Sequence, residues 1–140
     1  MSSLFYNAGK VALTNGTTAY STDTIKVALT TSAYTPNIDT DDFFNDVTNE
    51  IVGAGYTAGG ATLASKTITQ DNVNNRAVFD AADTTWTTST ITNARYAILY
   101  KSTGTPATSQ LLCYIDLLVD RSSLADTFKI EWDSTGIFYL

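Results

Sequence analysis

The chain has 140 residues, of which 44% are hydrophobic, 11% aromatic and only 16% charged, and its net charge is −6. This length suits one domain with its own core, and the hydrophobic content excludes a disordered chain. The acidic charge, with eight basic residues scattered singly, excludes an electrostatic footprint for nucleic acid and disfavours an anionic membrane surface. We therefore expect a single domain, 1–140, with no nucleic-acid partner and no membrane partner.

The first element expected in chain order is a helix within residues 1–16. Asn15-Gly16 would end it, and Ser2 or Ser3 could cap its start. Apolar residues recur at helical spacing at Leu4, Phe5, Ala8, Val11 and Ala12. The opening Met-Ser-Ser lacks the basic and apolar regions of a signal peptide, so we expect a protein made and folded in the cytoplasm.

The remainder, 24–140, is expected to be a β-rich body. Threonine occupies 25 positions of the chain, and this β-branched residue suits a pleated surface. Turns are predicted at 71–75, 102–109 and 121–126. Strand-like segments lie at 24–30, 61–69, 76–81, 90–101, 110–118, 127–133 and 137–140. The sequence therefore predicts a mainly β fold: a single antiparallel β-sandwich or jelly-roll-like domain with an N-terminal helix and one short additional helix.

That additional helix is predicted over 39–47, where acidic residues would occupy its first turn. The segment 39–50 can also be compared with the calcium-binding loop of an EF-hand. Counted from Asp39, it has residues with oxygen ligands at four of the expected positions. However, Phe44 stands where an EF-hand needs glycine, so the helix is the better account. A calcium site of another type stays open.

Two apolar runs, 95–101 and 111–118, are expected at the centre of a sheet, since strands buried on both faces are almost continuously apolar. The single cysteine, Cys113, lies in the second run. We expect it to be a small core residue, and it excludes an internal disulfide.

Catalytic motifs are sparse. The chain has no histidine, which removes the usual general base, the Ser-His-Asp and Cys-His systems and, with one cysteine, a structural zinc site. The glycines of 53–60 are not followed by the Lys-Ser/Thr of a phosphate loop. No spacing singles out a carboxylate pair for glycoside hydrolysis. We expect no enzyme activity, no cofactor and no metal.

Four segments resemble a family of small structural proteins of tailed-bacteriophage particles. They are 24–43 (TIKVALTTSAYTPNIDTDDF), 55–63 (GYTAGGATL), 94–101 (ARYAILYK) with 104–108 (GTPAT), and 128–140 (FKIEWDSTGIFYL). The resemblance covers most of the chain. It implies a capsid decoration (cement) protein, on the outer surface of a virion assembled in the host cytoplasm, or else a tail or fibre component that binds a receptor glycan.

For the cement role the resemblance implies the major capsid protein as partner and a homotrimer at three-fold positions of the shell. The chain's two terminal segments and two tyrosines in predicted loops are the contact residues that we expect. They are Leu4, Phe5, Tyr34, Tyr56, Ile137, Phe138 and Leu140. The apolar residues at the end of the chain could equally form a last strand of the core instead of a contact with another molecule. For the glycan-binding role, Tyr34, Tyr56 and Trp86 would form the platform.

Overall fold

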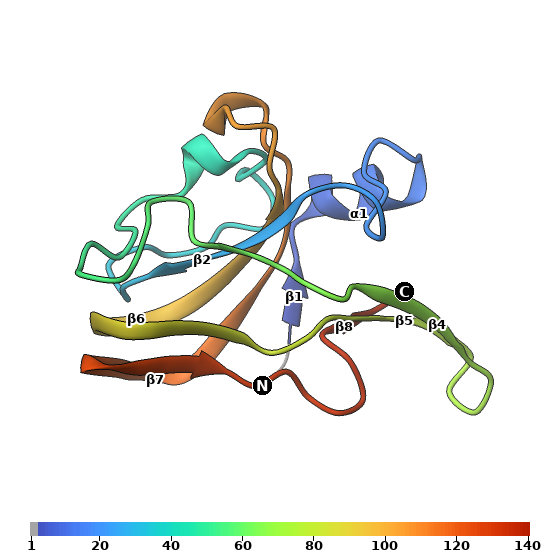
Figure 1. Cartoon of the computed structure of the whole chain (residues 1–140). Helices are drawn as coiled ribbons and strands as arrows, with labels where there is room; N and C mark the ends of the chain where they lie inside the picture. Colours follow the sequence, from blue (N-terminus) through green and yellow to red (C-terminus); the bar gives the residue numbers. More distant parts are fainter. Residues whose placement is uncertain (1–2) are drawn as a thin grey trace.

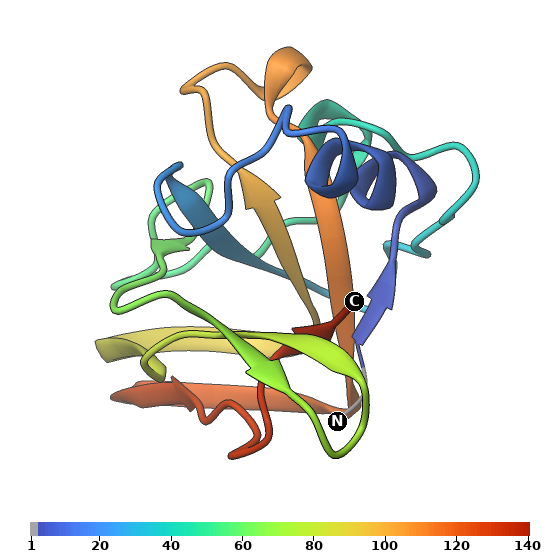
Figure 2. The same ribbon diagram turned by 90° about the vertical axis from the view of Figure 1, so that its right-hand side faces the viewer.

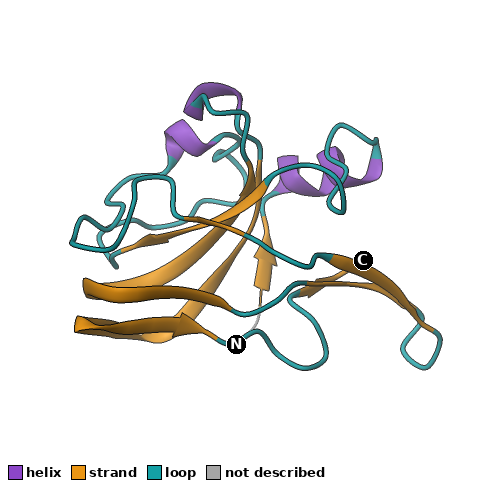
Figure 3. Cartoon of the chain, viewed as in Figure 1, coloured by secondary structure: helices purple, strands orange, loops and turns teal. Residues whose placement is uncertain are grey.

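The computed structural model describes residues 3–140, and in them antiparallel strands dominate, as the sequence predicts (Figures 1 and 3). A five-stranded sheet has the order β1-β7-β6-β2-β3, and a three-stranded sheet has the order β4-β5-β8. The first consists of β1 (Ser3–Phe5), β7 (Leu111–Ile130), β6 (Thr84–Lys101), β2 (Ile25–Thr30) and β3 (Ala61–Thr62). The second consists of β4 (Thr67–Asp71), β5 (Arg76–Asp80) and β8 (Phe138–Tyr139).

The longest strands, β6 and β7, form a hairpin in the five-stranded sheet that changes direction along its length. Their pairing runs from Tyr100↔Leu111 to Thr84↔Ile130 and is interrupted by five register shifts. In Figure 2 the early part of β6 and the late part of β7 cross the bottom of the molecule, whereas their other halves run upward. Bulges bend a strand and increase its twist, which allows this pair of strands to turn within one sheet.

The turn predicted at 121–126 is therefore wrong. Its polar residues lie inside β7, where the ladder with β6 continues through Ala94↔Arg121 and Ser89↔Asp126. Ala125 takes a left-handed backbone conformation with φ 47°, which absorbs one extra residue without ending the strand.

The central sheet is buried on both faces. On β6, Leu99 faces the main core between the layers, and its neighbours Ile98 and Tyr100 face a second core on the other side. This alternation follows the two-residue period of a strand. The two apolar runs, 95–101 and 111–118, lie in the paired central strands β6 and β7, which confirms their predicted place in the sheet.

The N-terminal helix begins later than the sequence predicts. Ser3–Phe5 pairs with Cys113–Ile115 as β1, and α1 spans only Asn7–Thr14. Helical spacing and strand alternation cannot be separated over so few residues, and an open edge on β7 captures the segment. Tyr6, at the junction, is fully buried and donates its backbone N–H to Leu112 O (3.1 Å).

The helix predicted over 39–47 is replaced by loops and a single 3-10 turn, η1 (Phe44–Asp46). The carboxylate of Asp46 accepts the backbone N–H groups of Asp42 (2.9 Å) and Phe43 (3.1 Å), and Asp41 accepts that of Asn37 (3.0 Å). Short acidic side chains that bond to nearby backbone in this way compete with helical hydrogen bonds. The segment covers the second core, with a further 3-10 turn, η2 (Pro106–Thr108), close to η1.

Candidate protein-contact surface

The hairpin of β4 and β5 projects from the body of the molecule and carries an apolar side chain at its tip (Figure 1). The connecting residues 72–75 are three asparagines and Val73, whose side chain is 89% exposed. Isolated exposed apolar residues are common on proteins, but a valine held at the end of a projecting hairpin is presented to whatever binds there.

Asp71 fixes the shape of this tip. One of its carboxylate oxygens accepts the backbone N–H groups of Val73 and Asn74, both at 3.1 Å. The other accepts the Asn74 amide (2.8 Å) and Arg76 Nε (2.9 Å). Four hydrogen bonds accepted by one side chain restrain the tip, and Val73 is exposed on it.

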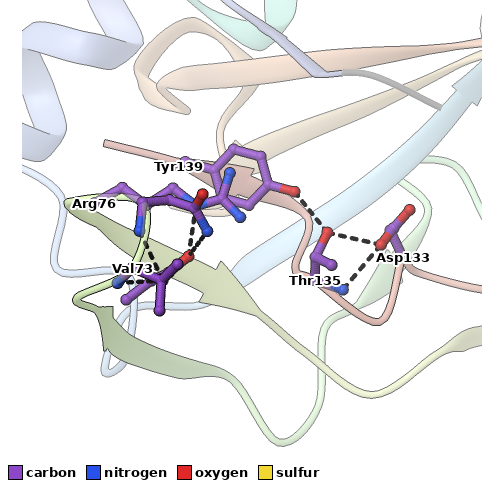
Figure 4. Close-up of polar contacts among 7 residues, drawn as sticks. Val73, Arg76, Asp133, Thr135 and Tyr139 are labelled. Atoms are coloured by element: carbon purple, nitrogen blue, oxygen red, sulfur yellow. Dashed lines mark hydrogen bonds and ion pairs between the residues drawn. The ribbon is translucent and has the colours of Figure 1, made fainter.

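The hairpin is braced against the end of the chain. The Arg76 guanidinium lies 3.6 Å from the centre of the Tyr139 ring, and the Tyr139 hydroxyl is 2.9 Å from Thr135 Oγ1. Thr135 in turn donates to Asp133 through its hydroxyl (2.8 Å) and its backbone N–H (2.9 Å). Figure 4 shows this series of contacts, which joins the tip to the 133–135 turn. A rigid surface binds without first losing conformational entropy.

Two further apolar side chains lie near the tip. Ile68 on β4 and Leu140 after β8 are 46% and 43% exposed. Both line a hollow of about 460 Å³ with Asp71, Arg76 and their neighbours. We call Ile68, Val73, Arg76, Tyr139 and Leu140, the residues around the tip and its brace, the hairpin face. By the register of the strands, Arg76 and Tyr139 lie on one side of the three-stranded sheet, and Ile68 and Leu140 lie on the other. Exposed apolar side chains together with an arginine and a tyrosine are typical of a protein interface.

The charge state of Asp71 gives this surface a testable pH dependence. Its hydrogen bonds from Asn74, and then the Arg76 guanidinium, lower the pKa of Asp71 from its usual value near 3.8 to about 2. The order that this carboxylate gives the tip is therefore complete above about pH 4 and is lost as the pH falls through about 2.

We expect a carboxyl NMR titration of Asp71 to have its midpoint near 2 in the wild-type protein. Asn74→Ala should raise that midpoint because it removes the largest stabilising contact of the carboxylate. The Val73 amide should shift with the same midpoint. An Asp71 midpoint close to 4 would contradict the described geometry.

The seven predicted contact residues occupy different environments. Leu4 is 51% exposed, Leu140 is part of the hairpin face, and Phe5 is half-buried against the main core. The other four are buried: Tyr34, Tyr56, Ile137 and Phe138. The predicted residues are therefore not brought together on one surface, and the role of the exposed ones stays a prediction.

Tyr34 and Tyr56 lie in loops, yet both loops fold over the central sheet. The Tyr34 hydroxyl is 2.9 Å from that of Tyr6 and donates to Asp41 (2.8 Å). The Tyr56 hydroxyl accepts the backbone N–H of Leu29 (2.9 Å) and donates to Glu50 (2.7 Å). Burial raises the pKa of both phenols above its ordinary value. Their hydroxyls satisfy buried partners, which is a structural use of tyrosine.

The side chains considered as nucleophiles or metal ligands are either buried or far from one another. Burial raises the pKa of the Cys113 thiol, which is enclosed in the main core, so its thiolate is disfavoured. Within residues 3–140, no three His, Cys, Asp or Glu side chains are grouped as metal ligands. No helix in this part of the chain is long and apolar enough to cross a membrane.

Of the hairpin face, the sequence predicts only Leu140 as a contact residue. The available signal was Val73, a single β-branched residue inside the predicted turn at 71–75. Comparison with protein families, with characterised proteins and with solved structures gives no match.

Proposed function

We propose that the chain is a non-enzymatic structural protein of a tailed-phage particle, a capsid decoration protein that binds the major capsid protein with its hairpin face. The observation that carries the proposal is the braced hairpin, which holds an 89% exposed valine on a projecting and internally bonded tip. A decoration protein stabilises a shell by binding the assembled state and not its separate subunits, so mass action favours assembly.

The resemblance of 24–43, 55–63, 94–101 with 104–108, and 128–140 to virion proteins supports this role. The last of these segments includes Tyr139 and Leu140 of the hairpin face. Many identical sites on a shell make a small contact sufficient, because each copy adds its own binding free energy. A rigid hairpin with three exposed apolar side chains suits such a contact.

The glycan-binding alternative has less support. The aromatic platform that it would use consists of Tyr34, Tyr56 and Trp86, and all three are at most 9% exposed. The Trp86 ring packs against Tyr56 and Phe128 at 5.9 Å between ring centroids, inside the main core. These rings hold the domain together and leave no free aromatic face for a sugar.

Val73→Asp should weaken binding to shells assembled without this chain by about 30-fold or more, because a carboxylate would have to be desolvated where the valine is buried. Co-sedimentation of the purified protein with such shells measures the affinity. The circular dichroism spectrum and melting temperature should not change, since the side chain is exposed in the free protein.

Val52→Asp is the matched control, because Val52 is 94% exposed but lies in the glycine-rich loop, outside the hairpin. It should bind like the wild type. Equal binding by both variants would refute the role of the hairpin face. Copies per particle then distinguish the two locations, since a number matching the capsid lattice supports the head, whereas a dozen or fewer would place the protein on the tail.

A further inference from the structure

The outer edge of β7 is open beyond a short segment near its start. β1 covers that edge only at Cys113–Ile115, and β6 pairs with the opposite edge. Among residues 3–140, no other strand pairs with 116–130. A long unpaired edge is a template for another strand, and proteins usually protect such edges with a bulge, an inward charge or a covering element.

This edge also carries the molecule's most exposed leucines. Leu124 is 81% exposed, and Leu118 and Val119 are 67% and 51% exposed. Leu118 has φ 70°, a left-handed conformation that is unfavourable for leucine. Its N–H is held by Asp116 (2.7 Å), which is bound by Arg95 (2.6 Å). The fold therefore maintains a strained backbone that presents apolar side chains to solvent, and strain of this kind gathers at functional sites.

A groove of about 580 Å³ follows the same edge. Its apolar lining consists of Leu118 and the core residues Leu117, Phe128 and Ile130, which are 3–7% exposed. A strand added along β7 would cover these side chains and supply partners for the free backbone groups at the same time.

The charges on this edge are complementary to a second copy of the edge itself. Ile91 pairs with Ser123 and Ser89 with Asp126, so Ala125 is an extra residue that does not advance the register. Arg121 therefore lies two register positions before Ser123, and Asp126 lies two positions after it, on the same face of the strand. Within residues 3–140 neither side chain forms an ion pair.

We propose that two copies of this chain pair antiparallel through their β7 edges, about a two-fold axis at Ser123. An isologous contact repeats every interaction, so Arg121 of each copy faces Asp126 of the other, giving two ion pairs. Leu124 of one copy lies diagonally across from Leu124 of the other. The net charge of −6 repels two copies elsewhere, whereas the segment 121–126, with one arginine and one aspartate, carries no net charge and is where they can meet.

This contact is independent of the capsid-binding role and of the hairpin face. It also gives pairs in place of the homotrimer that the resemblance implies. Sedimentation equilibrium over a wide range of concentration should fit a monomer–dimer equilibrium of the 15.1 kDa chain. A protein that stays monomeric at the highest concentration, or that forms trimers, overturns the proposal.

Charge exchange tests the register. Arg121→Asp places two carboxylates opposite each other at both ends of the contact, and Asp126→Arg does the same with two guanidinium groups. Each single variant should weaken dimerisation by about 30-fold or more. The double variant restores opposite charges and should dimerise like the wild type. If the double variant stays as weak as the single ones, the proposed pairing is wrong.

Two further variants separate this contact from the hairpin face. Leu124→Asp should abolish the dimer, whereas Val73→Asp, at a side chain of similar exposure, should leave it intact. Amide hydrogen exchange of 122–130 should slow as dimers form, because the edge N–H groups gain partners. A dimer that tolerates Leu124→Asp, or whose β7 amides are unprotected, would exclude pairing through this edge.

Discussion

Phe138→Ala is expected to lower the free energy of unfolding by about 3–5 kcal/mol, the largest effect of any substitution considered for this chain. The ring is fully buried and contacts three others, with centroids 4.6 Å from Phe79, 5.1 Å from Phe5 and 5.4 Å from Tyr20. Its removal leaves a cavity at the point where β8 and β1 meet the main core. Urea denaturation followed by tryptophan fluorescence measures the change.

Leu140→Ala provides the control, since its 43% exposed side chain should contribute less than about 1 kcal/mol. The pair also separates two roles for the end of the chain. If Phe138 acted chiefly in an intermolecular contact, Phe138→Ala would spare the stability of the free protein. A loss below about 1 kcal/mol would therefore contradict its assignment to the core.

Gly9→Ala is expected to destabilise the protein by about 3 kcal/mol, although alanine is the better helix former. The helix α1 rests on a bulge of β7, where Leu99 pairs with Cys113 and Tyr100 with Leu111, leaving Leu112 unpaired. A Cβ at Gly9 would lie 2.7 Å from both the Leu111 carbonyl oxygen and the Leu112 Cα. Backbone atoms cannot rotate away, so the helix would have to lift from the sheet.

Val11→Ala in the same helix is the matched control. Val11 is 58% exposed, and the gain in helix propensity should offset the small loss of contact, leaving stability within about 0.5 kcal/mol. Thermal and urea unfolding of the two variants should therefore differ clearly. Similar stabilities would show that α1 is not packed as closely as the structure indicates.

The parts of the fold that the sequence predicts are those that follow from local pattern. The alternation in 24–30 gives β2, and the continuous apolar runs give the centre of the sheet, because both patterns reflect burial of one or two strand faces. The turn at 71–75 is also found, since its asparagines and Asp71 favour a turn wherever the chain is placed.

The predictions fail where residues distant in the sequence determine the local structure. The polar residues 121–126 have the composition of a turn, but β6 provides a continuous partner that holds them in a strand. The sequence predicts contact roles for Tyr34 and Tyr56 because they lie in loops. The structure instead gives both hydroxyls buried hydrogen-bond partners, which are Tyr6, Asp41, Glu50 and Leu29. A local sequence pattern cannot predict any of these partners.

The candidate contact surface is also only partly predictable from local sequence patterns. The sequence indicates a contact at the apolar end of the chain, and Leu140 does lie on the hairpin face. It gives no sign that the hairpin carrying Val73 lies beside the end of the chain, because that arrangement depends on the pairing of β5 with β8 through Val78↔Tyr139. Spatial neighbours from different hairpins become evident only with the topology.

The long β6–β7 hairpin has a consequence for how the molecule comes apart. Side chains from both halves of the hairpin belong to the same main core, so neither half can separate from that core while the hairpin stays intact. Loss of the hairpin exposes Trp86 and Phe128 from one half together with Leu99 and Ile115 from the other, because all four belong to one core. Unfolding should therefore be a single cooperative transition, with coincident loss of fluorescence and circular dichroism signals and no stable half-unfolded form.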